Sequence, residues 1–191
     1  MITIYTLILD IQENLRTVKE QIAIAASEAV RDPTEIELVA VTKLQGLEDI
    51  QAALKAKHKI FGENRVQEAE GKWPNLREKF SGLQLHMIGP LQRNKVKRAV
   101  KLFDVIETID RSELAHAIAK ESRNLGRQLN CFIQVNTGEE PQKAGVLPED
   151  ADGFIDVCRR EYQLPVAGLM CIPPIDQNPA LHFALLAGIA Q

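Results

Sequence analysis

Lys43 is the residue of this sequence whose position most clearly suggests chemistry. It directly follows the apolar run Val39–Thr42, which is typical of a buried β-strand. Because side chains alternate along a strand, Lys43 should point to the same side as Val39 and Val41. If that side is the interior of a closed sheet, desolvation favours the neutral amine, which is the nucleophile that a carbonyl ligand needs. The alternative is a lysine that leaves the strand and extends into solvent, and its position alone does not decide between the two.

Polar residues also follow or interrupt other apolar runs. Asn64 ends Phe61-Gly62-Glu63-Asn64, where its amide either bonds a ligand or caps the next helix. His86 lies inside the run Leu83–Ile88, and a lone strand histidine is more often a core residue than a catalyst. Lys143 lies in the loop between Asn136 and Val146 as a second amine, although most loop lysines have no such role.

Five basic residues form the one cationic cluster of the chain: Arg93, Lys95, Lys97, Arg98 and Lys101. The cluster suits phosphate, from a ligand or from RNA, but a solvated helix face is the favoured interpretation. Aromatic residues do not interleave it, and the net charge is -3, so neither nucleic acid nor an anionic membrane is expected as a partner. The three cysteines have no CxxC pair, which favours a reducing cytosol.

The surrounding elements alternate between strands and helices. Apolar residues at steps of three and four predict a lead-in helix over residues 1–31, before Pro33. Six strand-like runs follow at Leu38–Val41, Lys59–Phe61, Leu83–Ile88, Leu102–Ile106, Cys131–Val135 and Val166–Met170. Helical patterns separate or follow them at Leu47–Lys57, Gln92–Lys101, Ser112–Leu125, Pro148–Tyr162 and Leu181–Ile189. This order predicts one α/β domain over residues 1–191, a (β/α) TIM-type barrel in which all strand ends meet at one rim.

Several motifs together resemble one protein family. They are Val39-Ala40-Val41-Thr42-Lys43, Phe61-Gly62-Glu63-Asn64-Arg65-Val66-Gln67-Glu68, His86-Met87-Ile88-Gly89-Pro90-Leu91-Gln92-Arg93-Asn94-Lys95, Glu107-Thr108-Ile109-Asp110, Gln134-Val135-Asn136 and Gly168-Leu169-Met170. In this order they resemble the pyridoxal 5'-phosphate (PLP) homeostasis proteins, also called the proline synthase co-transcribed family. Six ordered matches are far more specific than any one of them.

The resemblance implies a fold like the barrel domain of bacterial alanine racemase, a cytoplasmic location, and PLP held as a Schiff base on Lys43. It places Asn64, His86 and Met170 along the cofactor ring, with Asn136 and Lys143 near the entrance. It also implies buffering or delivery of PLP without established enzymatic turnover, and PLP-dependent apo-enzymes are the candidate partners.

The sequence departs from the family pattern at its C-terminal end. Family members continue past the position of Gln191 with two further strands, and in (β/α) barrels the phosphate commonly sits in the loops after strands seven and eight. We therefore expect an incomplete barrel of about six β/α units, truncated at the C-terminus. Two alternatives stay open: a PLP-dependent amino-acid racemase, and a truncated product that has lost its affinity for PLP.

Overall fold

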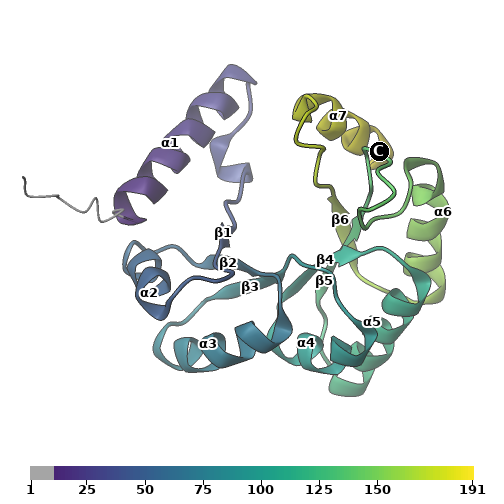
Figure 1. Ribbon diagram of the computed structural model, residues 1–191, viewed down its shortest axis with the longest axis horizontal. Helices are drawn as coiled ribbons and strands as arrows, with labels where there is room; N and C mark the ends of the chain where they lie inside the picture. The colour runs from purple at the N-terminus through teal and green to yellow at the C-terminus, as the bar shows by residue number, and fades with distance from the viewer. Residues whose placement is uncertain (1–10) are drawn as a thin grey trace, which may run out of the picture.

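The computed structural model describes residues 11–191 of the chain (Figure 1). The first element is helix α1, Ile11–Glu28; the part of the predicted lead-in helix over residues 1–10 lies outside the described residues. The chain then turns through a short 3-10 helix, Pro33–Glu35, which Asp32 caps by accepting a 2.8 Å hydrogen bond from the Thr34 amide. The helix thus ends at Glu28, a few residues before the predicted end near Pro33, and Pro33 itself begins the 3-10 helix.

Six parallel strands form one sheet in the order of the sequence. They are β1 (Ala40–Val41), β2 (Ile60–Glu63), β3 (Gln84–Met87), β4 (Val105–Ile109), β5 (Asn130–Gln134) and β6 (Val166–Met170). Each strand pairs with the next one along the chain, and within residues 11–191 β1 and β6 do not pair with each other. The expected (β/α) TIM-type architecture is confirmed, with six strands and a sheet that does not close.

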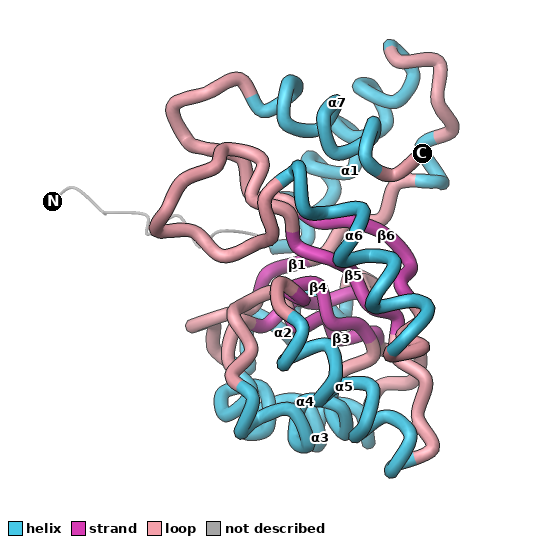
Figure 2. The backbone as a smooth tube through the Cα atoms, turned by 90° about the vertical axis from the view of Figure 1, so that its right-hand side faces the viewer, coloured by secondary structure: helices cyan, strands magenta, loops and turns pink. Residues whose placement is uncertain are grey.

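Helices follow the strands, and all of them except α7 cover one face of the sheet (Figure 1). They are α2 (Leu47–Lys55), α3 (Val66–Lys79), α4 (Val96–Leu102), α5 (Ser112–Leu125), α6 (Ala151–Asp156), which continues as the π-helical segment Val157–Glu161, and α7 (Pro179–Ile189). Short 3-10 helices at Arg93–Lys95 and Pro148–Asp150 precede α4 and α6. Figure 2 shows α1 and α7 on the opposite side of the sheet from α3, α4 and α5.

One predicted strand is placed wrongly. The run Leu102–Ile106 was expected to be a strand, but Leu102 ends α4 and the strand is Val105–Ile109. The physical reason is that Glu107 and Thr108 continue the strand although they are polar, because Glu107 bonds to His86 on the neighbouring strand. Other predicted elements agree closely: α5 and β6 have the predicted bounds.

The core lies between the sheet and the helices that cover it. Phe61 of β2 packs against Trp73 of α3 with ring centroids 4.9 Å apart, and both side chains are fully buried. Leu85 and Met87 of β3 belong to the same apolar cluster. Because strand side chains alternate, residues between these positions face the other side of the sheet, here called the inner face. The inner face is the side on which a (β/α) barrel encloses its interior.

Helix α7 leaves much of its apolar surface in contact with solvent. Leu181 and Phe183 are more than half exposed, whereas His182 is buried and bonds to Thr137. Asn178 caps the helix by accepting a 3.0 Å hydrogen bond from the Ala180 amide. Among residues 11–191, no helix has both the length and the apolar character needed to cross a bilayer.

Candidate functional site

Lys43 lies two residues beyond the end of β1. Val41 pairs with Gly62, and Lys43 lies in the turn that follows, as Asn64 follows β2. Lys43 is exposed, and its side chain makes no hydrogen bond or ion pair with any residue between 11 and 191. Val41, which points to the same side, is 48% exposed. Of the two alternatives that the sequence left open, the structure has the lysine in contact with solvent, because the open sheet leaves the inner face at β1 uncovered.

Side chains of α3 hold the backbone on both sides of Lys43. The Leu44 amide donates to Glu68 Oε1 at 2.6 Å, and Lys72 Nζ donates to the Thr42 carbonyl oxygen at 3.0 Å. Glu68 and Lys72 also pair with each other at 2.6 Å, one helical turn apart. Leu44 has a φ of 62°, a left-handed conformation that a leucine adopts only when its surroundings impose it. The turn that carries Lys43 is thus held in place by α3.

Glu63 is the buried centre of this arrangement. Its side chain is fully buried, and Oε1 accepts hydrogen bonds from Thr42 Oγ1 at 2.8 Å, Trp73 Nε1 at 3.2 Å and Lys72 Nζ at 3.2 Å. A buried carboxylate is tolerated when it is paired and hydrogen-bonded in this way. The hydrogen bond from Lys72 also holds the pKa of Glu68 below its ordinary value, despite partial desolvation of that carboxylate.

Sequence reasoning assigned no role to Glu63, Glu68 or Lys72. The four-residue spacing of Glu68 and Lys72 on a helix was the available signal, because residues at that spacing share a helix face. Nothing in the spacing indicated that both would reach the end of β1. We refer to Glu63, at the end of β2, and to Glu68 and Lys72 of α3 together as the α3 clamp.

His86 and Glu107 form a hydrogen-bonded pair on the inner face. His86 pairs with Gly62 and Val105 in the strand register, between the core residues Leu85 and Met87. Its Nδ1 lies 2.5 Å from Glu107 Oε1, with side chains 8% and 18% exposed. His86 Nε2 is buried and has no hydrogen-bond partner. The histidine is therefore more than a packed core residue, because one ring nitrogen is held by a carboxylate and the other is unsatisfied.

Asn64 directly follows β2, and its backbone packs tightly against Gly89. A Cβ added at Gly89 would lie 2.4 Å from the Asn64 carbonyl oxygen, so only glycine fits there. The Gly89 carbonyl oxygen accepts a 2.7 Å hydrogen bond from Thr108 Oγ1. Asn64 does not cap α3, whose N-cap residue is Arg65 with no side-chain capping bond, so the capping alternative is wrong. Its side-chain oxygen is buried without a hydrogen-bond partner.

Asn136 and Lys143 are bonded within their own loop. Asn136 Nδ2 donates to the Glu140 carbonyl oxygen at 2.9 Å, and its Oδ1 accepts from the Glu140 amide at 3.3 Å. Lys143 forms an ion pair with Glu140, and its Nζ lies 3.5 Å from the Pro173 carbonyl oxygen. These contacts place both residues in a closed loop after β5 rather than beside Lys43.

Met170 ends β6, at the opposite edge of the sheet from Lys43. It is half-buried and pairs with Gln134 in the strand register, while its carbonyl oxygen accepts a 2.8 Å hydrogen bond from the Val135 amide. Of the six predicted site residues, Lys43 and Asn64 follow the adjacent strands β1 and β2, and His86 lies within the next strand, β3. Met170, Asn136 and Lys143 lie on or after β5 and β6, toward the other edge of the open sheet.

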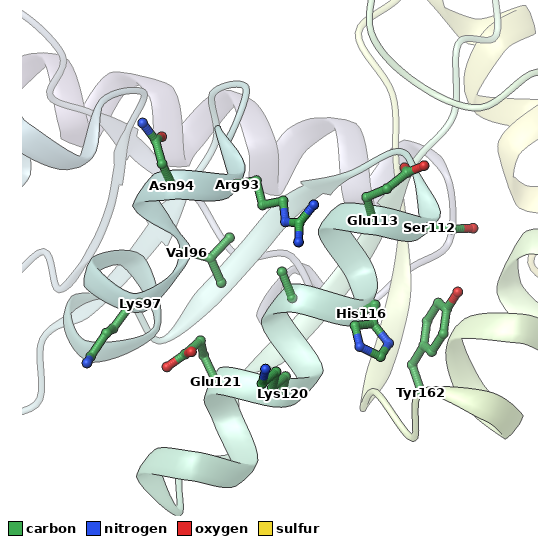
Figure 3. Close-up of a pocket in the computed structure, with 11 residues that line it drawn as sticks. Arg93, Asn94, Val96, Lys97, Ser112, Glu113, His116, Lys120, Glu121 and Tyr162 are labelled. Carbon is green, nitrogen blue, oxygen red and sulfur yellow. The ribbon is translucent and has the colours of Figure 1, made fainter.

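Two of the five residues of the basic cluster border a surface groove on the helical side of the molecule (Figure 3). The groove, of about 560 Å³, is lined by Arg93 and Lys97 together with α5 residues that include His116. Two carboxylates, Glu113 and Glu121, line it as well, so the groove is not uniformly positive. This mixture agrees with the interpretation of the cluster as a solvated helix face.

Comparison with known proteins places the chain in a family. Residues 11–185 match the family described as the alanine racemase N-terminal domain. The pyridoxal phosphate homeostasis protein of Escherichia coli K12 is 36% identical over 182 residues, which cover 95% of this chain and 78% of that protein. The chain belongs to the pyridoxal phosphate homeostasis protein family. Its relative from Pasteurella multocida is 35% identical over 166 residues, covering 85% of this chain and 70% of that protein.

Solved structures agree with this family membership. The structure of PipY from Synechococcus elongatus with PLP bound superposes with a TM-score of 0.79 at 31% identity, covering 94% of this chain and 80% of PipY. An alanine racemase of Clostridium difficile superposes with a TM-score of 0.68 at 17% identity, covering 95% of this chain and 45% of the racemase. The second likeness shows the fold alone. This member of the homeostasis family therefore shares its architecture with racemases and its sequence with pyridoxal phosphate homeostasis proteins.

Proposed function

We propose that this chain is a PLP-binding homeostasis protein that holds PLP as a Schiff base on Lys43. The observation that carries the proposal is the Lys43 amine itself, which is exposed and unpaired among residues 11–191 at the strand end that matches the family motif. In this proposal residues 1–191 act as one (β/α)-barrel-type domain in the cytoplasm. The chain binds and releases PLP and has no enzymatic turnover.

The residues on the inner face fit such a ligand. Asn64 Oδ1 and His86 Nε2 are buried polar atoms without partners in the protein, and such atoms are uncommon unless a ligand or water completes them. PLP supplies an aldehyde that condenses with an amine. Lys43 would hold it covalently, while Asn64 and His86 would line its ring. Met170 lies on the same inner face, and Asn136 and Lys143 contribute, if at all, by shaping the loop after β5.

The exposure of Lys43 supports a role in transfer. An amine in contact with solvent can exchange its ligand with another protein more readily than an amine sealed inside a closed core. PLP-dependent apo-enzymes are the recipients that this proposal names. A net charge of -3 supports no role for nucleic acid or anionic membranes.

A PLP titration followed by borohydride reduction tests the proposal. We expect an absorption band of a lysine-bound aldehyde in the wild-type protein, and mass spectrometry should find the reduced adduct on Lys43. Lys43→Ala should abolish both, whereas Lys120→Ala, an exposed lysine of α5, should change neither. A band that persists in Lys43→Ala would contradict the assignment.

The racemase alternative lacks a specific supporting observation. Racemisation needs acid/base groups on both faces of the substrate carbon, and tyrosine is a candidate for the second group. Tyr162 lies on the helical side against His116, with ring centroids 5.4 Å apart, and Tyr5 lies outside the described residues. The lost-affinity alternative is decided by the same titration, because it expects no saturable band at any accessible PLP concentration.

A further inference from the structure

The turn that carries Lys43 has a backbone conformation that its side chains do not explain. The Gln45 amide donates to the Thr42 carbonyl oxygen at 3.1 Å, so residues 42–45 form a β-turn with Lys43 and Leu44 as its two central residues. Leu44 has a φ of 62°, and glycine or asparagine is usual where the second central residue has a positive φ. The Leu44 side chain is 82% exposed, so its packing does not hold this conformation. The hydrogen bonds of the backbone must hold it instead.

Glu68 and Lys72 bond to the two peptide groups that flank Lys43. The Thr42 carbonyl oxygen belongs to the peptide group before Lys43, and it accepts from Lys72 Nζ at 3.0 Å. The Leu44 amide belongs to the peptide group after Lys43, and it donates to Glu68 Oε1 at 2.6 Å. The orientations of two successive peptide planes define φ and ψ of the residue between them. Bonds to both planes therefore fix the direction in which the Lys43 Cα–Cβ bond leaves the turn.

The two anchoring side chains are themselves held firmly. Glu68 and Lys72 are 21% and 14% exposed, lie one turn apart on α3 and pair with each other at 2.6 Å. Lys72 also donates to the fully buried Glu63. Lys43, in contrast, is exposed and has no hydrogen bond or ion pair with any residue between 11 and 191. The backbone of this lysine is thus fixed, while its amine is free to meet a ligand.

We propose that Glu68 and Lys72 are positioning residues for the Lys43 amine, and that they fix its backbone so that the amine meets a carbonyl ligand from one direction. This inference rests on the proposed function at Lys43 and adds the residues that set the geometry of the covalent bond. In that bond-forming step the neutral amine gives up two hydrogens, a C=N bond forms, and the aldehyde oxygen leaves as water. An amine on a fixed backbone loses less conformational entropy in this step than an amine on a mobile turn.

The backbone part of the inference is tested without ligand, by hydrogen exchange of the Leu44 amide followed by NMR. Exchange should be slow in the wild type, because the amide is bonded to a carboxylate although its residue is exposed. Glu68→Ala removes the acceptor and should speed the exchange at least tenfold, whereas Glu68→Gln keeps an acceptor oxygen and should retain most of the protection. Glu78→Ala, at an exposed glutamate of the same helix, is the matched control. Equal exchange rates in Glu68→Ala and the wild type would overturn the inference.

The ligand part is tested by titration with PLP and borohydride reduction, with the adduct on Lys43 measured by mass spectrometry. Glu68→Ala should weaken binding about tenfold, a modest value for the loss of a charge-assisted hydrogen bond, and Glu68→Gln should restore most of it. Trinitrobenzenesulfonate needs only an accessible amine, so it should label Lys43 at similar rates in these variants and the wild type. Leu44→Asn in the Glu68→Ala background should regain part of the lost affinity, because asparagine tolerates a positive φ better than leucine does. Glu78→Ala should behave like the wild type.

The outcomes separate this inference from the proposed function. If Glu68→Ala forms the Lys43 adduct with the affinity of the wild type, only the positioning role is refuted. The positioning role is also refuted if Glu68→Ala slows the reaction with both reagents, because Glu68 then controls the accessibility of the amine rather than its direction. If the wild type forms no adduct on Lys43, the proposed function fails and the inference fails with it.

Discussion

Replacing Lys72 by methionine should test how the turn carrying Lys43 is held. Methionine keeps the length of the apolar stem but removes the ammonium that bonds Glu63, Glu68 and the Thr42 carbonyl oxygen. Glu63 is fully buried and Lys72 is 14% exposed, so the substitution leaves a buried carboxylate without its cation. Breaking a buried pair from one side costs about 3–5 kcal/mol. Because Thr42 and Trp73 still bond Glu63, we expect a loss of about 3 kcal/mol in the free energy of unfolding.

Urea denaturation monitored by Trp73 fluorescence measures this loss. Trp73 is the single tryptophan and donates to Glu63, so its signal reports directly on the α3 clamp. The double variant Glu63→Gln with Lys72→Met also removes the unpaired negative charge of Glu63, and it should regain at least half of the lost free energy of unfolding. Lys120→Met, on the exposed face of α5, should change stability by less than about 0.5 kcal/mol. A loss below about 1 kcal/mol in Lys72→Met would refute the assignment of Glu63 as a charged buried centre.

Three further predictions follow from the described residues. The pKa of Glu68 is lowered in the folded protein, so its contribution to stability is present above its ordinary pKa of 4.5 and is lost as the pH falls toward the folded-state pKa. In this pH range, the free energy of unfolding should depend less steeply on pH in Glu68→Gln than in the wild type. Burial raises the pKa of Cys131 to about 12, so mass spectrometry after thiol alkylation at pH 8 should find Cys171, which is only half-buried, modified first. Gly89→Ala should lower the free energy of unfolding in urea by about 2 kcal/mol, because the added Cβ would clash with the Asn64 backbone. Gly71→Ala, which has open space around it in α3, should raise the free energy of unfolding by up to about 1 kcal/mol. Equal effects of the two substitutions would contradict the packing at Gly89.

Local patterns in the sequence were sufficient for most of the fold. Helix α5 and strand β6 agree with their predicted bounds because their apolar periodicity and end signals are local, as with Gly126, which ends α5 with a φ of 59°. Strand β4 was misplaced because its polar residues are satisfied by another strand, which no local pattern reveals. The apolar face predicted for the N-terminal helix is also less buried than expected, because within α1 only Ala26 is buried.

The sequence by itself determined the order of strands and helices, the position of Lys43 at a strand end and the family motifs around it. Periodicity and spacing report on residues two to four positions apart, and these features depend on nothing more distant. Only the tertiary structure decided that Lys43 is exposed, since that depends on whether other strands cover the inner face. It also decided that Glu63, Lys72 and Thr42 meet, because three separate elements must pack before their side chains come within hydrogen-bonding distance.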